Sequence, residues 1–358
     1  MKLTTQFDLY FVFLGSKLPA YATASIKLAS VTSGVNLCLI GNRSIQKSVK
    51  HLPVKFTAVE DFYDSREFDL AKNGVTADHK YRNGIWLKSL ERFFVIHQYM
   101  TAFNQPSILH AELDQLLFKT QSLVESLKNT KLTGLFFPFH SESSAIASIV
   151  YINNLAALKS LLDFAQSGVK YPNEMVLIAE WGKRNPHLIF QLPTAATLMK
   201  NRTDSYLPKV RLLTATELGG VVDAAQLGQW VAGIDPKHLT LSARPLTLFV
   251  DSPSEFLLGR EQLETLRFAQ DVIGAVSISS SSDLINVSLY NLHIHSKIHS
   301  TLVNGKISIS EMLDSASRVS QIEIPGSREQ QILGWIQSRF YLSRRIARKI
   351  LRILLMKE

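Results

Sequence analysis

Residues 7–40 read FDLYFVFLGSKLPAYATASIKLASVTSGVNLCLI and carry the clearest signal of the fold. Residues 7–14 are apolar apart from Asp8 and rich in aromatic side chains, which is typical of a strand buried on both faces. Residues 18–31 favour a helix of small and apolar residues, and residues 35–40 predict a second buried strand. A strand, a helix and a parallel strand within about 35 residues make a βαβ unit. The sequence therefore predicts an α/β fold with a mostly parallel sheet.

The rest of the chain continues this alternation of helices and strands. No Gly-x-Gly-x-x-Gly follows the first strand, which disfavours an enzyme that uses a nicotinamide or flavin dinucleotide. The apolar periodicity predicts helices over residues 86–102, 144–164, 221–231, 261–268 and from 328 to the end, and strands over residues 108–111, 135–139, 246–250 and 286–295.

The positive charge of the chain is concentrated at its carboxyl end. Of the net charge of +9 over 358 residues, residues 338–358 contribute +6 through seven basic residues and one acid. A nearly neutral body disfavours nucleic acid as a partner, because nucleic-acid-binding proteins spread basic groups over a face of the fold. Apolar side chains at near-helical spacing lie between the basic ones, so the tail predicts an interfacial helix on an anionic membrane surface. The alternative is a solvated basic helix packed on the domain.

The cysteine content and hydropathy point to a cytoplasmic protein. Cys38 is the only cysteine, so no disulfide can form within the chain, and a reducing compartment is the natural inference. No stretch approaches the roughly 18–20 apolar residues that cross a bilayer. We therefore expect a cytoplasmic location, with peripheral binding to the inner face of the cell membrane as an option.

Two carboxylates, Glu112 and Asp114, come directly after the predicted strand 108–111 (ILHA). The carboxyl ends of parallel strands form the edge at which open α/β folds bind ligands. Hard divalent cations prefer carboxylate oxygens together with phosphate oxygens. The pair thus predicts a metal site that bridges to a diphosphate, with a solvated turn as the alternative.

A second group of polar residues, His293, His295 and Lys297, stands at alternate positions near the end of the late strand. In an extended chain such residues share one face. A neutral imidazole can bind a metal, and a lysine acts as a point charge on a phosphate. The alternative is a partly exposed strand that turns its polar residues towards water.

Together the two groups suit the departure of a nucleoside diphosphate, whose negative charge a metal and a lysine can neutralise. The order of buried strand, acid-x-acid pair, long middle section and late His/Lys motif resembles GT-A-type glycosyltransferases. Further segments resemble bacterial surface-polysaccharide glycosyltransferases of this type: residues 86–94 (WLKSLERFF), 223–230 (DAAQLGQW) with 233–236 (GIDP), and 291–297 (NLHIHSK).

The resemblance spans roughly residues 7–300 and implies a domain organisation. A GT-A-like, Rossmann-related domain with a mixed, mostly parallel sheet flanked by helices would occupy residues 1–327. Its donor half would cover about residues 1–150 and its acceptor half about residues 151–327. Residues 328–358 would form the basic amphipathic C-terminal helix.

The resemblance also implies an activity. The chain would move a sugar from a nucleotide-diphosphate sugar to a glycan or glycolipid acceptor in surface polysaccharide synthesis, with Mn²⁺ or Mg²⁺ as cofactor. The metal ligands would be Asp114, Glu112, His293 and His295. The donor would be bound by Lys88, Arg92, Glu112 and Lys297, and the catalytic residues would be Asp223 and Lys297.

Some of these assignments have structural alternatives. Because the first acid is Glu112 rather than the commoner aspartate, Asp114 is favoured as the direct metal ligand. Asp223 would contact a sugar hydroxyl or act as general base for the acceptor, or else would only favour the start of a helix. Arg92 would reach the donor, or else would only pair with a carboxylate.

Two other functions stay open at this point. His293 and His295 could belong to a metal-dependent hydrolase, although few later carboxylates or histidines are present to complete such a site. The chain could also be a non-catalytic α/β scaffold that binds a partner or a membrane through its basic tail.

Overall fold

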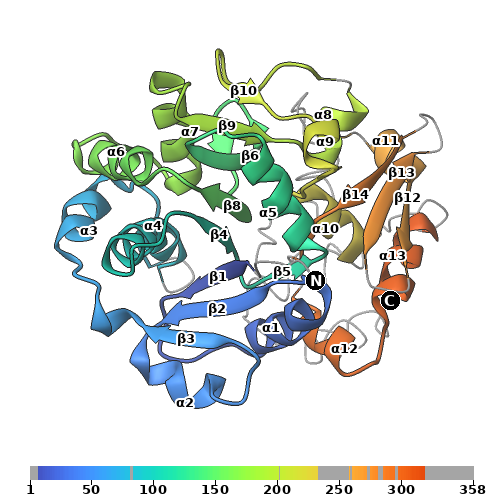
Figure 1. Cartoon of the computed structure of the whole chain (residues 1–358), viewed down its shortest axis with the longest axis horizontal. Helices are drawn as coiled ribbons and strands as arrows, with labels where there is room; N and C mark the ends of the chain where they lie inside the picture. Colours follow the sequence, from blue (N-terminus) through green and yellow to red (C-terminus); the bar gives the residue numbers. More distant parts are fainter. Residues whose placement is uncertain are drawn as a thin grey trace, which may run out of the picture.

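The central sheet lies among the residues that a computed structural model describes, which are 7–80, 84–200, 202–232, 258, 260–271, 275–280, 285–294 and 297–318. Its strands are β1 (Asp8–Phe13), β2 (Asn36–Gly41), β3 (Lys55–Ala58), β4 (Ile108–Ala111), β6 (Leu135–Ser141), β7 (Ser144–Ala145), β8 (Ile149–Ile152), β9 (Ile189–Leu192) and β10 (Arg211–Leu212). Within the described residues they form a nine-stranded sheet in the order β10-β9-β6-β8-β4-β1-β2-β3, with β7 paired to β6 (Figure 1).

Most neighbouring strands of this sheet run parallel. β1 pairs in parallel with β2 and β4, β2 with β3, β6 with β9, and β9 with β10. β8 runs antiparallel to both of its neighbours, β4 and β6. The carboxyl ends of β4 and β6 therefore lie at the same edge of the sheet. The prediction of an α/β fold with a mixed, mostly parallel sheet is confirmed.

Alternation along the strands produces a buried layer on each face of the sheet. In β1, Tyr10 belongs to one buried cluster, whereas Leu9 and Phe11 belong to another. The first cluster includes side chains of α4 (Ile85–Ala102), α6 (Leu155–Gln166) and α7 (Glu174–Arg184), and the second includes those of α1 (Ala20–Thr32) and α5 (Thr120–Asn129). The other described α-helices are α2 (Gln46–Val49), α3 (Arg66–Ala71), α8 (Ala195–Met199), α9 (Ala215–Leu218), α10 (Gln226–Ala232), α11 (Arg260–Thr265), α12 (His299–Val303) and α13 (Ile309–Arg318).

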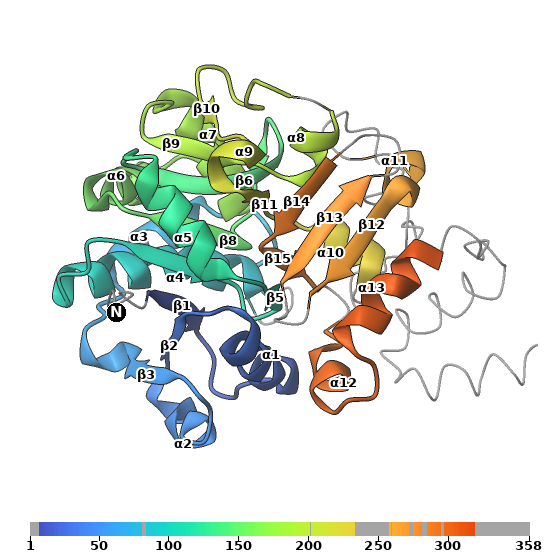
Figure 2. The ribbon, with the colours of Figure 1, turned by 45° about the vertical axis from the view of Figure 1, so that its right-hand side comes forward.

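A smaller sheet stands beside the central one (Figure 2). It has the order β11-β14-β13-β12, and its strands are β11 (Gly220–Val221), β12 (Leu266–Gln270), β13 (Val276–Ser280) and β14 (Ile285–Leu289). Side chains of α10 and α13, among them Trp230 and Leu313, share a third buried cluster with this sheet. A two-stranded sheet of β5 (Gln115–Leu117) and β15 (Asn291–His293) joins the two parts.

Residues 144–164 differ from their predicted helical structure. They form β7 and β8 before the helix α6 begins. The four residues of β8 (IVYI) are all buried, because this strand lies between β4 and β6 in the middle of the sheet. The helix starts only at Leu155, after the capping residue Asn154, whose side chain accepts a hydrogen bond from the Ala157 N–H at 2.9 Å.

Three later predictions also need correction. The helix expected from residue 221 begins at Gln226, because residues 220–221 pair with β14 as β11. The strand expected over residues 286–295 is two strands, β14 and β15, which belong to different sheets. The helix over residues 261–268 ends at Thr265, and β12 begins at Leu266. The predicted strand 246–250 and the basic helix 328–358 lie outside the described residues.

Among the helices of the described residues, none has the length and apolar character that crossing a bilayer requires.

Candidate active site

The two polar segments singled out in the sequence meet through the pairing of β5 with β15. His293 lies opposite Gln115 in this antiparallel pair. Beyond the pair, the Ile294 N–H donates to the backbone carbonyl of Asp114 at 2.8 Å. On the other side, the Glu112 N–H donates to the carbonyl of Ser148 at 3.0 Å. Backbone hydrogen bonds thus hold the acid-x-acid segment against the late histidine strand at the carboxyl end of β4.

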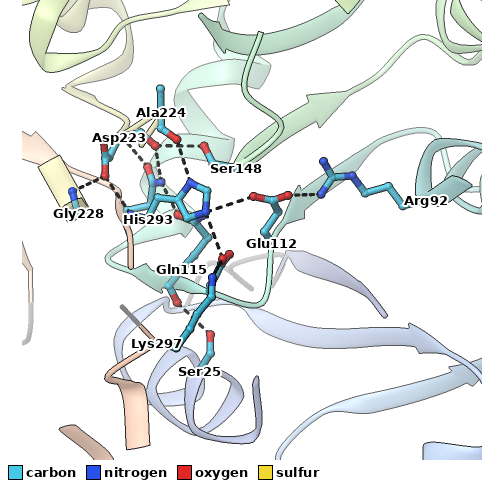
Figure 3. A network of polar contacts seen from close by, with 12 residues as sticks. Ser25, Arg92, Glu112, Gln115, Ser148, Asp223, Ala224, Gly228, His293 and Lys297 are labelled. Carbon is cyan, nitrogen blue, oxygen red and sulfur yellow. Dashed lines mark hydrogen bonds and ion pairs between the residues drawn. The ribbon is translucent and has the colours of Figure 1, made fainter. Parts of the chain in front are cut away.

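The side chains of these segments form one charged cluster (Figure 3). The imidazole Nε2 of His293 lies 3.2 Å from Oδ2 of Asp114 and 3.5 Å from Oε2 of Glu112. The ammonium group of Lys297 forms an ion pair with the same Oδ2 of Asp114. Asp114 and His293 are largely shielded from solvent, with 15% and 9% of their side chains exposed. Two acids and two bases therefore share one small, mostly buried volume.

The charges of the cluster stabilise one another. Burial alone would raise the pKa of the Asp114 carboxyl, but Lys297 and His293 outweigh it and hold this pKa well below its usual range. Burial alone would lower the pKa of His293, but the Asp114 carboxylate outweighs it and raises this pKa to about 9. Asp114 thus favours the protonated ring of His293, and Lys297 adds a second positive charge beside the two carboxylates.

Asp223 holds the backbone around His293. Its carboxylate accepts hydrogen bonds from the N–H groups of His293 at 3.0 Å, Gly228 at 2.8 Å and Leu227 at 3.0 Å. The carbonyl of Ala224 lies 3.1 Å from Nδ1 of the His293 ring. Asp223 is only 2% exposed. In this structure the Asp223 carboxylate fixes the strand, and the Ala224 carbonyl orients the ring of His293.

Gly228 is required for this close approach. A Cβ atom at this position would lie 2.1 Å from the backbone oxygen of His293 and 2.8 Å from its nitrogen. No side chain fits there unless the backbone moves, so the glycine of the DAAQLGQW segment serves the packing of α10 against β15.

Asn291 and Gln115 link the two sheets beneath the cluster. The Asn291 amide donates to Oε1 of Gln115 at 2.7 Å and to the carbonyl of Asp223 at 2.9 Å, and its oxygen accepts from the Asp223 N–H at 2.9 Å. Asn291 and Gln115 are both completely buried. The three hydrogen bonds of Asn291 fix the register of both segments.

Arg92 connects Glu112 to a third acid. Its guanidinium donates to Oε1 of Glu112 at 2.5 Å and to Oε1 of Glu174, at the start of α7, at 3.3 Å. Burial raises the pKa of Glu174 to about 7, with Arg92 opposing this effect. Arg92 is 6% exposed and lies beside the cluster, where it pairs with both carboxylates.

The remaining predicted site residues lie in different surroundings. Lys88 stands one turn before Arg92 on α4 with an exposed side chain. His295 lies outside the described residues. The structure thus brings together Arg92, Glu112, Asp114, Asp223, His293 and Lys297, and the roles assigned to them stay predictions.

The sequence motifs did not single out two further acids, Glu174 beside Arg92 and Glu91 at the ends of the first strands. Glu174 follows Pro172 and Asn173. An acidic residue at that position is typical of the first turn of a helix and gives no sign of a functional site. Glu91 lies beside Arg92 in the WLKSLERFF segment, and only its place next to a predicted donor residue could have drawn attention to it. Burial raises the pKa of Glu91, and the Tyr63 hydroxyl lies 3.4 Å from its Oε1.

Glu91 and Tyr63 line a cavity of about 350 Å³ at the carboxyl ends of β1, β2 and β3. Its other lining residues follow those strands or the loop after them: Leu14, Asn42, Val59, Glu60 and Ser65. Because β1 is the neighbour of β4, this cavity and the charged cluster share one edge of the sheet. That edge is where open α/β sheets bind ligands.

Three side chains of the cluster could hold a metal ion. Glu112, Asp114 and His293 each offer a ligand atom, and these atoms lie within 4.8 Å of one another. Oδ1 of Asp114 is buried and has no hydrogen-bond partner, so one carboxylate oxygen is left for a further ligand. Carboxylate oxygens suit Mg²⁺ and Mn²⁺, and imidazole is a common metal ligand.

Comparisons with known proteins give similarities to solved structures at low sequence identity. No protein-family model and no curated protein matches the sequence. The structure is similar to mouse xyloside xylosyltransferase 1 in its apo form (TM-score 0.38, 13% identity, 52% of this chain and 85% of that one). It is also similar to the apo form of the glycosyltransferase GlyE of Streptococcus pneumoniae TIGR4 (0.37, 12%, 88% and 64%) and to a cytidylyltransferase of Leptospira borgpetersenii (0.32, 12%, 53% and 77%).

Glycosyltransferases of the GT-A type are thus among the structures that this chain resembles, as the sequence motifs predicted.

Proposed function

We propose that the chain is a metal-dependent glycosyltransferase that takes a sugar from a nucleotide-diphosphate sugar. The observation that carries this proposal is the convergence of Glu112, Asp114, His293 and Lys297 at the carboxyl end of β4. Carboxylates and an imidazole for a cation, beside an ammonium for a phosphate, are the groups that a departing diphosphate requires.

Asp114 and His293 would hold the cation, Mn²⁺ or Mg²⁺, with Glu112 as a further ligand. Bound there, the cation would neutralise charge that develops on the diphosphate as the bond to the sugar breaks. The Ala224 carbonyl lies beside Nδ1 of His293 and leaves Nε2 facing the acids, so Nε2 would bind the cation after releasing its proton. The proposal keeps His295 as a possible ligand.

Lys297 would bind the diphosphate directly. In the structure its ammonium is held by Asp114 over the ring of Tyr21, 5.2 Å from the ring centroid. Its side chain is 22% exposed, so it can turn from Asp114 towards an arriving phosphate. Arg92 would remain beside Glu112, and the exposed Lys88 on the same helix would add positive charge near the donor.

The nucleoside would occupy the cavity at the ends of β1, β2 and β3. Neighbouring strands lie about 4.8 Å apart, so this cavity lies between one and three strand spacings from the end of β4. That separation suits a base and ribose whose phosphates reach the charged cluster. The carboxylate of Glu91 can accept hydrogen bonds from ribose hydroxyls or from a base N–H.

Asp223 would act mainly through His293, whose backbone it holds. The predicted contact of Asp223 with a sugar hydroxyl, or its action as a base, would require it to exchange one of three backbone hydrogen bonds for the substrate. Its positioning role needs no such exchange.

The acceptor would be a glycan or glycolipid of surface polysaccharide synthesis, and the donor and acceptor halves would be those expected from the sequence. A cytoplasmic location with residues 338–358 on the inner face of the membrane fits such an acceptor. Deletion of this tail should release the protein from anionic vesicles, and unchanged binding after deletion would remove the membrane part of the proposal.

A thermal-shift screen tests the proposed donor. Mn²⁺ together with the correct nucleoside diphosphate should raise the melting temperature of the wild type, and Asp114→Ala should abolish the rise. Asp163→Ala is a matched control, because Asp163 is an exposed acid paired with Lys159. No rise with any common nucleoside diphosphate would contradict the proposal. A rise with Mn²⁺ alone that no nucleotide increases would support a hydrolase instead.

A further inference from the structure

A second, much narrower hollow lies beside the charged cluster, on the side away from the cavity at the ends of β1, β2 and β3. Small and apolar residues form most of its wall, together with His140 at the end of β6: Phe139, Thr194, Ala195, Ala196, Val222, Asp223, Ala224, Ala225, Gln226 and Leu227. Its volume of about 20 Å³ fits one water-sized group. Asp223 and Ala224, which hold His293, are part of the wall, so the hollow backs directly onto the cluster.

The hollow also belongs to the same edge of the sheet. β6 and β4 run in the same direction, with β8 between them, so His140 stands two strand positions from the acids that follow β4. The nucleoside cavity lies beyond β4 in the opposite direction. Along this edge the order is therefore nucleoside cavity, charged cluster and His140.

The backbone at His140 is irregular. β6 pairs with β7 through Phe139 with Ala145 and Ser141 with Ser144, and the register shifts between these two pairs. Such a bulge adds an unpaired residue and turns its side chain away from the regular alternation of the strand. The irregularity falls at His140, the residue that lines the hollow.

The imidazole of His140 has unused hydrogen-bonding capacity. Its Nδ1 is buried and has no partner, which costs free energy unless a ligand or a water satisfies it. Burial lowers the pKa of His140, with a hydrogen bond to the Ser144 backbone opposing this effect. A neutral ring can accept a hydrogen bond from a hydroxyl group.

We propose that His140 and the narrow hollow form a subsite for one sugar hydroxyl, with His140 as the residue that contacts it. This inference rests on the proposed glycosyl transfer. One hydroxyl fits the volume, the His140 ring on the wall offers an acceptor, and the small apolar side chains suit the carbon atom that carries the hydroxyl. The hydroxyl comes either from the transferred sugar or from the acceptor sugar.

Two variants of the full chain separate the hydrogen bond from the fold. His140→Phe keeps a ring of similar size without nitrogen, and His140→Asn keeps a polar group near the position of Nδ1. His97→Phe is a matched control, because His97 is also half-buried with an unpartnered Nδ1 but lies on α4 away from the hollow. The probes are the nucleotide sugar found in the thermal-shift screen, its nucleoside diphosphate, and a panel of methyl glycosides as acceptors.

The two sources of the hydroxyl give different results. If it belongs to the transferred sugar, His140→Phe should bind the nucleotide sugar about tenfold more weakly and the nucleoside diphosphate unchanged. If it belongs to the acceptor, donor binding should be unchanged and the KM for the methyl glycosides should rise about tenfold. In either case His140→Asn should recover most of the loss and His97→Phe should behave as the wild type.

Wild-type values for donor affinity and acceptor KM in folded His140→Phe would overturn the subsite while leaving the proposed function intact. A loss of nucleoside diphosphate binding as well would also overturn it, because His140 would then act on the whole site. A wild type that binds no nucleoside diphosphate with Mn²⁺ would contradict the proposed function itself.

Discussion

Nε2 of His293 lies 3.2 Å from Oδ2 of Asp114, although the two residues belong to segments from opposite halves of the chain. The pairing of β5 with β15 and the carboxylate of Asp223 create this contact. Lys297 forms an ion pair with the same oxygen of Asp114. In the structure the negative charge of this proposed metal ligand is therefore balanced by side chains of the protein itself.

Lys297 should therefore have opposite effects on the two proposed ligands. It competes with a cation for Asp114, so Lys297→Met should bind Mn²⁺ alone as tightly as the wild type or more tightly. The same variant should bind a nucleoside diphosphate with Mn²⁺ roughly tenfold more weakly, because a point charge on the phosphate is lost. Calorimetric titrations of both ligands check this, with Lys88→Met for comparison. A parallel loss of both affinities would show that Lys297 only supports the fold.

Gly228→Ala should disturb the cluster more than its small size suggests. The added Cβ would lie 2.1 Å from the backbone oxygen of His293, so β15 or α10 must shift. We expect a loss of about 2 kcal/mol in stability, as for overpacking in a core, together with weaker Mn²⁺ binding. Gly168→Ala is the control, because it has a positive φ but nothing within 4 Å of its Cβ, and it should cost about 1 kcal/mol without affecting Mn²⁺. Equal effects of the two changes on Mn²⁺ binding would be inconsistent with this packing.

Asn291→Ala should be among the most destabilising polar changes in the described part of the chain. It removes a buried amide and leaves Oε1 of Gln115 and the backbone of Asp223 without three hydrogen bonds. We expect a loss of roughly 3 kcal/mol in the free energy of unfolding by urea. Asn36→Ala, which removes one exposed hydrogen bond to Asp8, should cost well under about 1 kcal/mol. Similar losses in both variants would argue against the network.

Glu174 gives the protein a dependence of stability on pH. Its pKa is raised from 4.5 in an unfolded chain to about 7 in the folded protein, chiefly by burial. A raised folded pKa contributes stability that is present below about pH 4.5 and is lost as the pH rises through 7. Glu174→Gln lacks this titration, so its stability relative to the wild type should improve by up to roughly 3 kcal/mol between pH 5 and pH 8. Melting temperatures of the two proteins over this range provide the test, and parallel profiles would contradict the assignment.

The sequence predicted the parts of the site that depend on local pattern. The strand 108–111 and the helix 86–102 agree with the structure to within one residue, because a fully buried strand and a long amphipathic helix have distinct periodicities. The placement of Glu112 and Asp114 at a ligand-binding edge followed from the strand before them.

What the sequence did not reveal depends on partners far along the chain. The strand at 149–152 is a short apolar run that periodicity alone cannot separate from a helix. Asp223 reads as the start of a helix, whereas its carboxylate also holds the backbone of His293 on another element. Glu174 and His140 carry no motif, and their positions become informative only when the sheet places them beside the cluster.

The binding of Mn²⁺ measured by electron paramagnetic resonance tests most directly whether the two segments hold one cation. Asp114→Asn and His293→Gln should each weaken Mn²⁺ binding at least about tenfold, while Asp163→Asn and His97→Gln leave it unchanged. Wild-type affinity in both site variants would show that the acid-x-acid segment and the late histidine do not share a metal, and the proposed reaction would lose its basis.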